Sequence, residues 1–345
     1  MVKINMKQWK DALIQGKKRV AMPIMTHPGI ELTGKRVIDA VKNGELHYLA
    51  IKALADSFPT AASTIIMDLT VEAEAFGCKI IFGEHEVPAV SDRLVSDFDS
   101  VANLKIPNIQ SGRVSEYLKA SRLAAENIHD RPVLGGCIGP FSLAGRLFDM
   151  TEIMTAAFIE PETITLLLEK CTQFLISYAI EMKKTGINGI IMAEPAAGLL
   201  DESMCDQFSS VYVKRVVEAV QDDQFLFILH NCGNTGHLTQ SMINTGAFGL
   251  HFGNKIDIIQ VLKEVPPEIL VMGNLDPVSV FKMATTKEMN LLTNQLLAAT
   301  EEYPNFVLSS GCDTPPGVPV DNIIVFFETI EKFNKNKLLK NSLTY

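Results

Sequence analysis

Short apolar runs, each ending in glycine, proline or a polar residue, recur along the chain and are followed by longer segments of helical periodicity. This alternation is typical of parallel strands that are joined by crossover helices. Eight strands are predicted, at residues 20–25, 64–67, 132–137, 189–192, 225–229, 249–252, 270–272 and 306–308. A further short extended piece is expected near residues 79–82.

Apolar residues spaced three and four apart predict the helices between these strands. The segment 161–185 has this spacing, 203–221 follows Asp201 as a possible N-cap, and 286–303 follows Thr285. Earlier helices are expected at residues 7–15, 34–43, 45–56 and 114–127.

Eight strands with intervening helices fit one TIM (β/α)₈ barrel, a fold of typically about 250 residues that tolerates insertions. The chain has 345 residues, with neither a low-complexity linker nor a strong internal repeat. We therefore expect a single domain over residues 1–345, with an N-terminal helical extension and a helical insertion around residues 143–158.

Polar side chains gather where the predicted strands end, whereas the strand bodies carry almost none. In a TIM barrel the catalytic residues lie at the C-terminal ends of the strands, so this distribution indicates an enzyme. The residues at these ends are His27, Asp68, Cys137, Glu194, His230, Cys232, His251, Asn274, Asp276, Cys312 and Asp313.

Three of these residues have the chemistry of a zinc site. His230 and Cys232 are two apart at the end of a strand and should point the same way. Cys312 follows another strand, in a Ser-Gly-Cys-Asp turn. Two thiolates and one imidazole suit zinc, and three protein ligands leave a fourth position open, as in catalytic sites. The alternative is that each is an ordinary buried packing residue.

The remaining cysteines are predicted to be packing residues. Cys78, Cys171 and Cys205 fall in helices or loops, whereas Cys137, near a strand end, is either packed or lines a pocket.

Charge and composition narrow the class of protein. A net charge of −9 argues against a nucleic-acid binder, since such proteins cluster lysine and arginine. The basic stretch 332–340 is expected in a terminal helix. The N-terminus does not have the pattern of a signal peptide, and no apolar run of about 18 residues predicts a membrane span. A cytoplasmic protein with reduced thiols is expected.

Several segments resemble one known family over nearly the whole chain. The chain is similar to the uroporphyrinogen decarboxylase superfamily, and within it to the methylcobamide:coenzyme M methyltransferases. The resemblance implies a TIM barrel and a zinc motif at His230, Cys232 and Cys312. The supporting segments are MDLTVEAEAFGCKIIFGEHEVP (67–88), PVLGGCIGPFSLAGRL (132–147), MAEPAAGLLDESMCDQF (192–208), LHNCGNTGHL (229–238), VMGNLDP (271–277) and SSGCDTPPGVPVDNI (309–323).

The decarboxylase itself is a poorer match. It binds the carboxylates of its tetrapyrrole with an arginine-rich segment after the first strand, and here residues 22–31 contain no arginine. The chain also departs from the methyltransferase branch, because Glu194-Pro195 stands where that branch usually has Asp-Pro.

The resemblance implies a methyl transfer. A small thiol, such as coenzyme M, would bind zinc as its thiolate and attack the methyl group of a methyl-Co(III) corrinoid carried by a small partner protein. The products would be a thioether and Co(I). Three alternatives stay open: methylation of the corrinoid from a small donor, a metal-independent decarboxylase, and a non-catalytic scaffold. A homo-oligomer is possible.

The other strand-end residues receive provisional roles. Glu194 and Asp276 are candidate catalytic residues, with Glu194 as a metal ligand, a base or a group that orients a ligand. His27, Asp68, Asn274 and His251 are candidate cofactor-binding residues. For each of them the alternative is a structural role, such as capping backbone or stabilising a turn.

Overall fold

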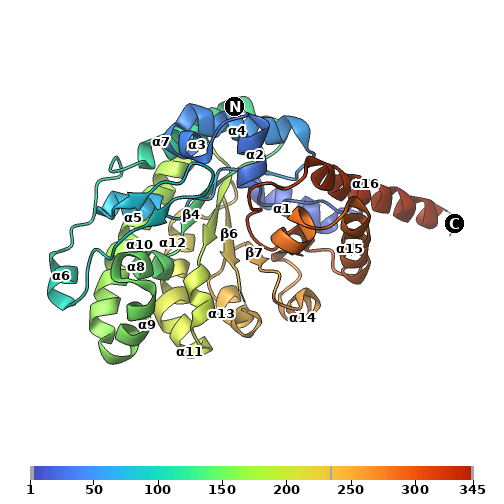
Figure 1. Ribbon diagram of the computed structural model, residues 1–345. Coiled ribbons are helices and arrows are strands. Elements are labelled where there is room, and N and C mark those ends of the chain that lie inside the picture. The colour runs from blue at the N-terminus through green and yellow to red at the C-terminus, as the bar shows by residue number, and fades with distance from the viewer. Residues whose placement is uncertain (1–3, 234, 343–345) are drawn as a thin grey trace.

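The computed structural model describes residues 4–233 and 235–342, and its centre is a curled parallel sheet surrounded by helices (Figure 1). Seven strands follow one another in the order β1-β4-β5-β6-β7-β8-β9. The TIM-barrel architecture predicted from the alternating pattern is confirmed. The strands are β1 (Ser63–Thr64), β4 (Val133–Ile138), β5 (Gly189–Ala193), β6 (Leu226–Asn231), β7 (Gly249–Phe252), β8 (Leu270–Leu275) and β9 (Phe306–Ser310).

Residues 20–24 fill the eighth position of the barrel without forming a regular strand. Ala21 makes a parallel bridge with Leu308 of β9, and its carbonyl accepts a hydrogen bond of 2.8 Å from Ala61 N, just before β1. The predicted strand 20–25 is thus reduced to a bridge. Pro23 has no N–H to donate, and the chain turns at Met25 into α2 (Thr26–Leu32). We call residues 20–24 the closing segment.

The prediction of a strand at 64–67 was wrong in its bounds, since β1 ends at Thr64. Ile65 N still donates to Leu134 O of β4 at 3.0 Å, but the next two amides bind side chains. Ile66 N donates to Nε2 of His47 at 2.9 Å, and Met67 N donates to the hydroxyl of Thr26 at 3.1 Å. The extended piece expected near 79–82 is β2 (Ile80–Ile81), which pairs antiparallel with β3 (Ala89–Val90).

Most predicted helices are present with small shifts of their ends. They are α1 (Met6–Gln15), α4 (Gly44–Ser57), α7 (Val114–Asn127), α10 (Pro161–Lys184), α15 (Thr286–Ala299) and the terminal α16 (Val320–Ser342). Asp201 and Thr285 cap their helices as predicted, accepting from Met204 N and Glu288 N.

Three predicted helices are divided or shortened. The 34–43 helix is only α3 (Val37–Lys42), because Gly34 has a left-handed φ of 65°. The insertion at 143–158 is two helices, α8 (Pro140–Phe148) and α9 (Met150–Ile159). The 203–221 helix is α11 (Glu202–Cys205), a π-helical turn (Asp206–Ser210) and α12 (Val211–Val220).

Four short helices were not predicted from the pattern. They are too brief for apolar periodicity to accumulate. They are α2, α5 (Val71–Phe76), α6 (Phe98–Asn103) and α14 (Ile258–Glu264). A helix was expected after the His230–Cys232 motif, and α13 (Thr239–Ile243) lies there.

The N-terminal extension closes one end of the barrel. Met6 is fully buried and, with Trp9 and Leu13, packs on the inward-facing side chains of the strands. Met6 N donates to Asp223 O before β6, and Lys10 Nζ donates to Glu268 O before β8. Because α1 covers the N-terminal ends of the strands, the opposite end is left for a site.

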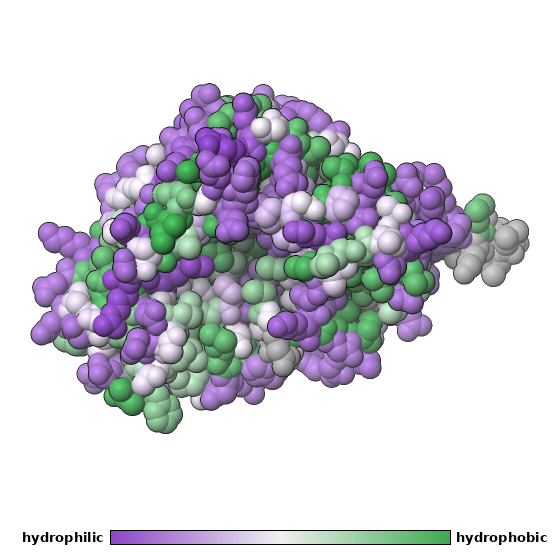
Figure 2. All heavy atoms as spheres, viewed as in Figure 1, coloured by the Kyte–Doolittle hydropathy of each residue, from purple (hydrophilic) through white to green (hydrophobic). Residues whose placement is uncertain are grey.

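The outer surface in the view of Figure 2 mixes hydrophobic and hydrophilic residues without a continuous apolar band. Within residues 4–233 and 235–342, no helix is both long enough and apolar enough to cross a membrane.

Candidate metal centre and its cavity

His230, Cys232 and Cys312 meet at the C-terminal end of the barrel. His230 is the last residue but one of β6, Cys232 follows that strand, and Cys312 follows β9. One ligand atom from each lies within 4.8 Å of the others. Donors bound to one zinc at 2.0–2.3 Å in a tetrahedron are about 3.5–3.8 Å apart. The three side chains therefore need only small movements to bind one ion.

The two cysteines interact with each other. A hydrogen bond from the Cys312 thiol lowers the pKa of Cys232 to about 7, and the same contact raises the pKa of Cys312. His230 beside it acts in the opposite direction on the pKa of Cys312. Two sulfurs and one imidazole at this spacing fit a soft tetrahedral metal such as zinc.

A chain of hydrogen bonds fixes the tautomer of His230. The Ser309 hydroxyl donates to Met22 O at 2.7 Å, so it accepts from Nε2–H of His251 at 2.9 Å. Burial lowers the pKa of His251 well below its usual value, so this ring is neutral and its Nδ1 is an acceptor. Nδ1–H of His230 therefore donates to it at 2.8 Å. This leaves the lone pair of His230 Nε2 free for a metal.

A cavity of about 310 Å³ opens beside the three residues. Its wall is mostly apolar, with the three candidate metal ligands and a few other polar groups. This composition is typical of small-molecule sites, although the volume is at the small end of their range. The lining residues are Ile24, His27, Met67, Leu69, Val87, Pro88, Arg146, Ala193, Pro195, His230, Cys232, Cys312, Asp313, Thr314, Pro315 and Pro316.

His27 lines this cavity, as its position at a strand end led us to expect. Its Nδ1 lies 3.0 Å from Thr314 O and donates to it, which leaves Nε2 as a base with no hydrogen-bond partner among the described residues. Asp313 beside it accepts from Thr26 N at 2.8 Å, and burial raises the pKa of Asp313.

Glu194 is buried next to the site but its carboxylate is engaged elsewhere. Its oxygens accept from Phe141 N at 3.0 Å and Ser142 N at 2.6 Å, in the first turn of α8. Burial raises its pKa to about 7. It is not among the three clustered ligands. The capping alternative considered for Glu194 describes these contacts.

Asn274 and Asp276 stabilise the loops at the barrel mouth. Asn274 Nδ2 donates to Gly253 O at 3.1 Å and Ile256 O at 3.0 Å. Asp276 accepts from Asn254 Nδ2 at 2.6 Å and caps the π-helical turn Pro277–Lys282. These contacts hold the loop after β7, where a Cβ on Gly253 would lie 3.0 Å from the Cα of Cys232. Neither residue lines the cavity.

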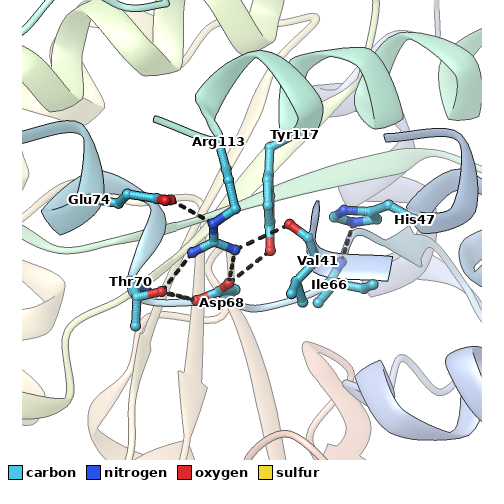
Figure 3. A network of polar contacts seen from close by, with 8 residues as sticks. All are labelled: Val41, His47, Ile66, Asp68, Thr70, Glu74, Arg113 and Tyr117. Carbon is cyan, nitrogen blue, oxygen red and sulfur yellow. Dashed lines mark hydrogen bonds and ion pairs between the residues drawn. The ribbon is translucent and has the colours of Figure 1, made fainter. Parts of the chain in front are cut away.

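Asp68 belongs to a separate buried network (Figure 3). It forms an ion pair of 2.5 Å with Arg113 and accepts from Tyr117 Oη at 3.1 Å and from Thr70. Arg113 also donates to Glu74, Thr70 and Val41 O. Each carboxylate oxygen of Asp68 thus accepts from two protein donors, which supports the structural alternative for this residue.

The four other cysteines are buried, and burial raises the pKa of each thiol. This agrees with the packing role predicted for Cys78, Cys171 and Cys205.

Sequence reasoning missed Ser309 and Arg146. Ser309 belongs to the Ser-Ser-Gly-Cys segment 309–312. Nothing in that segment indicates that its hydroxyl contacts His251. Arg146 stood in Leu-Ala-Gly-Arg-Leu, within the predicted insertion. A charged residue among apolar ones in a helix was the one available signal.

Comparison with protein-family models matches residues 18–333 to the family described as uroporphyrinogen decarboxylase (URO-D). A methylcobamide:CoM methyltransferase, MtbA of Methanosarcina acetivorans, is 27% identical over 335 residues, covering 90% of this chain and 94% of the relative. MtbA of Methanosarcina mazei is 29% identical over 285 residues, covering 79% and 80%. A uroporphyrinogen decarboxylase of Legionella pneumophila is 25% identical over 282 residues, covering 79% of each chain.

Two solved structures share the fold. A methyltransferase from Methanosarcina mazei superposes with a TM-score of 0.86 at 23% identity, covering 96% of this chain and 99% of that one. A B12-independent methionine synthase from Shewanella gives a TM-score of 0.56 at 11% identity, covering 95% and 98%. At these identities the likeness concerns the fold alone.

Proposed function

The chain belongs to the uroporphyrinogen decarboxylase family, and from this premise we propose that it is a zinc-dependent methyltransferase that moves a methyl group from a corrinoid to a small thiol. The observation that carries the proposal is the cluster of His230, Cys232 and Cys312 at the wall of a cavity. Relatives named methylcobamide:CoM methyltransferase support it.

Zinc at this cluster would supply a positive charge that stabilises a bound thiolate at neutral pH. The chain's own residues prepare that position. The hydrogen bonds through His251 and Ser309 hold His230 with Nε2 unprotonated. Three protein ligands leave one coordination position, and the cavity beside them gives access for the sulfur of the substrate.

The remaining polar groups of the cavity take supporting roles in this proposal. We assign His27 Nε2 as the acceptor of the proton that the thiol loses, because it is an unpartnered base in the same cavity. Glu194 and Asp276 hold α8 and the loop after β7 in place, Asn274 supports the same loop, and Asp68 stabilises the fold. The apolar wall restricts water around the reacting sulfur.

We propose that the methylated corrinoid is presented by a separate small protein. The thiolate of the small substrate attacks the methyl carbon of this corrinoid and forms a thioether. The methyl–cobalt bond breaks, and its electron pair stays on cobalt to give Co(I). The corrinoid carries the difficult chemistry, and the barrel supplies position and charge.

The cavity favours this activity over decarboxylation of a porphyrinogen. A substrate with eight carboxylates needs several cationic partners, and Arg146 is the one lysine or arginine among the residues that line the cavity. The opposite direction of transfer, from a small donor to the corrinoid, uses the same residues and is decided by experiment.

Metal analysis tests the proposal. The purified protein should hold about one zinc per chain, and Cys232→Ala or Cys312→Ala should each reduce the content severely. Cys78→Ala, which alters a buried cysteine outside the site, is the matched control. A metal content unaffected by the two site variants would refute the zinc site.

Activity is measured as the spectral change when methylcobalamin is demethylated by thiols. Removing zinc should abolish the change and restoring zinc should recover it. Methylation of Co(I) cobalamin by methyl thioethers, with no demethylation by any thiol, would reverse the assigned direction. Full demethylation by the zinc-free protein would contradict the proposed role of the metal.

A further inference from the structure

Cys232 and Cys312 differ from the other cysteines in their access to small molecules. All six cysteines lie within residues 4–233 and 235–342. Four of them are buried, whereas Cys232 and Cys312 are half-buried and line the cavity of about 310 Å³. No other cysteine lines this cavity. A thiol-reactive molecule that enters it therefore meets these two sulfurs.

The two sulfurs are close enough to react with each other. The candidate ligand atoms of His230, Cys232 and Cys312 all lie within 4.8 Å of one another. A disulfide needs a sulfur–sulfur distance of about 2.05 Å. Rotation about χ1 moves a cysteine sulfur while its Cα stays in place. Rotation of the two side chains toward each other thus shortens the separation without displacing β6 or β9.

The backbones of the two cysteines are spaced by one loop. A Cβ on Gly253 would lie 3.0 Å from the Cα of Cys232, and a Cβ on Gly311, next to Cys312, would lie 3.0 Å from the Cα of Asn254. Gly253 and Asn254 are successive residues of the loop after β7, so both cysteine-bearing segments pack on it. This spacing comes from backbone packed on backbone, so it does not depend on a bound metal.

A metal and a disulfide compete for the same two sulfurs. Zinc binds cysteine as the thiolate, and a sulfur that is bonded to another sulfur no longer has this charge. The cluster has three donors among the described residues, so loss of both sulfurs leaves His230 alone. A protein in which Cys232 and Cys312 are joined therefore has no zinc site.

From this arrangement we propose that Cys232 and Cys312 form a reversible disulfide when the protein is metal-free and a small organic disulfide, RSSR, enters the cavity. One cysteine thiolate attacks a sulfur of RSSR, forms a mixed disulfide and displaces RS⁻. The second cysteine thiolate attacks the bonded cysteine sulfur and displaces the second RS⁻. The two leaving groups take up the two protons that the cysteines have lost. The protein dithiol is oxidised by two electrons, and RSSR is reduced to two RSH.

The oxidant that this exchange needs is the oxidised form of a small thiol, which is the proposed class of substrate. The protein would lose its metal site when the surrounding thiols are oxidised, and excess thiol would restore the site by the reverse exchange. This consequence for methyl transfer rests on the proposed function. The disulfide itself requires only the two cysteines and the cavity.

The disulfide is tested by mass spectrometry on the full chain. Metal-free protein is incubated with 2-hydroxyethyl disulfide, its free thiols are alkylated, and it is digested with trypsin without reduction. Residues 216–255 and 288–332 are two tryptic peptides, and each has a single cysteine, Cys232 or Cys312. They should be recovered as one linked species that dithiothreitol separates. The free thiols of the denatured protein should fall by two from the six in the sequence.

Variants identify the two reacting sulfurs. Cys232→Ser and Cys312→Ser should each give a stable mixed disulfide with 2-mercaptoethanol on the remaining cysteine, and no linked peptides. Cys78→Ala removes a buried cysteine and is the matched control, so it should give the linked peptides as wild type does. Circular dichroism confirms that each variant is folded.

Zinc is the second variable of the experiment. With free zinc at about 100 times its dissociation constant, about 1% of the protein is metal-free, so the link should form about 100-fold more slowly. The linked protein should bind no zinc in equilibrium dialysis until dithiothreitol has reduced it.

Several results would overturn the disulfide. They are six unreacted thiols, a mixed disulfide that persists in wild type, a link through another cysteine in place of this pair, and equal rates with and without zinc. The methyl transfer is judged separately. Linked peptides from a protein that demethylates no methylcobalamin support the disulfide and count against the methyl transfer. Demethylation by a protein that never forms the link has the opposite meaning.

Discussion

Two arginines near the C-terminal end of this barrel have opposite surroundings. Arg113 is buried among Asp68, Glu74, Thr70 and a backbone carbonyl, so its donors are used inside the protein (Figure 3). Arg146 lies beside an open cavity and has no hydrogen bond or ion pair to the residues the structure describes. Both are cations taken partly out of water, and only one is compensated.

The difference separates polar groups that bind other protein groups from polar groups that face the cavity without a partner among the described residues. Asp68 was expected to bind a cofactor because it follows a strand, yet its oxygens are all occupied by protein donors. His27 was chosen by the same criterion, and its Nε2 remains without a partner in the cavity. A position at a strand end is therefore not enough to select a candidate ligand-binding residue. The residue also needs a polar atom that has no partner within the described protein.

The largest effect on stability is expected from breaking the network around Arg113, whose donors are bound within the protein. Arg113→Met leaves Asp68 buried without its counter-ion, and removal of one partner from a buried pair costs about 3–5 kcal/mol. We expect the free energy of unfolding, measured by urea denaturation, to fall by that amount.

Arg146→Met is the matched substitution of the arginine that lines the cavity. It removes a charge that has no protein partner, so the free energy of unfolding should change by less than about 1 kcal/mol. Equal losses for the two variants would show that the contrast between the regions has no energetic basis.

Glu72 interacts electrostatically with both arginines and should give a pH-dependent effect on stability. Burial raises its pKa in the folded state to about 7 from 4.5. Between these pH values the folded state retains a proton that the unfolded state has released, so stability falls as pH rises and the loss is complete above pH 7. The loss is at most about 3 kcal/mol.

Glu72→Gln removes this titration. The variant should match wild type near pH 4.5 and exceed it by up to about 3 kcal/mol at pH 8, as measured by urea denaturation at each pH. Glu218→Gln, at an exposed position of α12, should show no such change. A constant difference between Glu72→Gln and wild type across this range would contradict the assigned pKa.

The hydrogen bonds behind His230 are tested by metal affinity. Ser309→Ala removes the acceptor of His251 Nε2–H and releases the tautomer of His230. Loss of such a supporting hydrogen bond costs 10- to 100-fold in metal affinity, or about 1.4–2.7 kcal/mol. The dissociation constant for zinc is measured by competition with a chelator.

Ser310→Ala is the control on the same strand. Ser310 is equally buried, but its hydroxyl contacts the backbone of Ile24 and not the histidines. Equal losses of zinc affinity in the two serine variants would mean that the effect comes from packing of β9 and not from the tautomer.

Periodicity was sufficient to predict the barrel because long helices and buried strands leave strong patterns, as in residues 114–127 and 161–185. It failed at residues 20–25, where apolar composition resembles a strand but Pro23 and the turn into α2 leave a single bridge. It also missed α2 and α5, which are six or seven residues long.

The candidate ligands could be found from the sequence because cysteine and histidine at strand ends are chemically distinctive. Arg146 could not, since its role depends on which carboxylates lie near it in space. Asp68 pairs with Arg113, 45 residues away, and no local pattern shows that this partner is taken. Likewise, nothing in the order of residues shows that both carboxylate oxygens of Glu194 accept hydrogen bonds from the backbone of α8.

The closing segment has a consequence for the order in which the protein matures during synthesis. Met22 O accepts the last hydrogen bond of the chain that runs through Ser309 and His251 to His230. Met22 leaves the ribosome before Ser309, and the whole segment 23–308 is made between them. The chain of hydrogen bonds to His230 is therefore complete only when the closing segment meets β9, and a nascent chain that lacks β9 has neither a closed barrel nor this chain of hydrogen bonds.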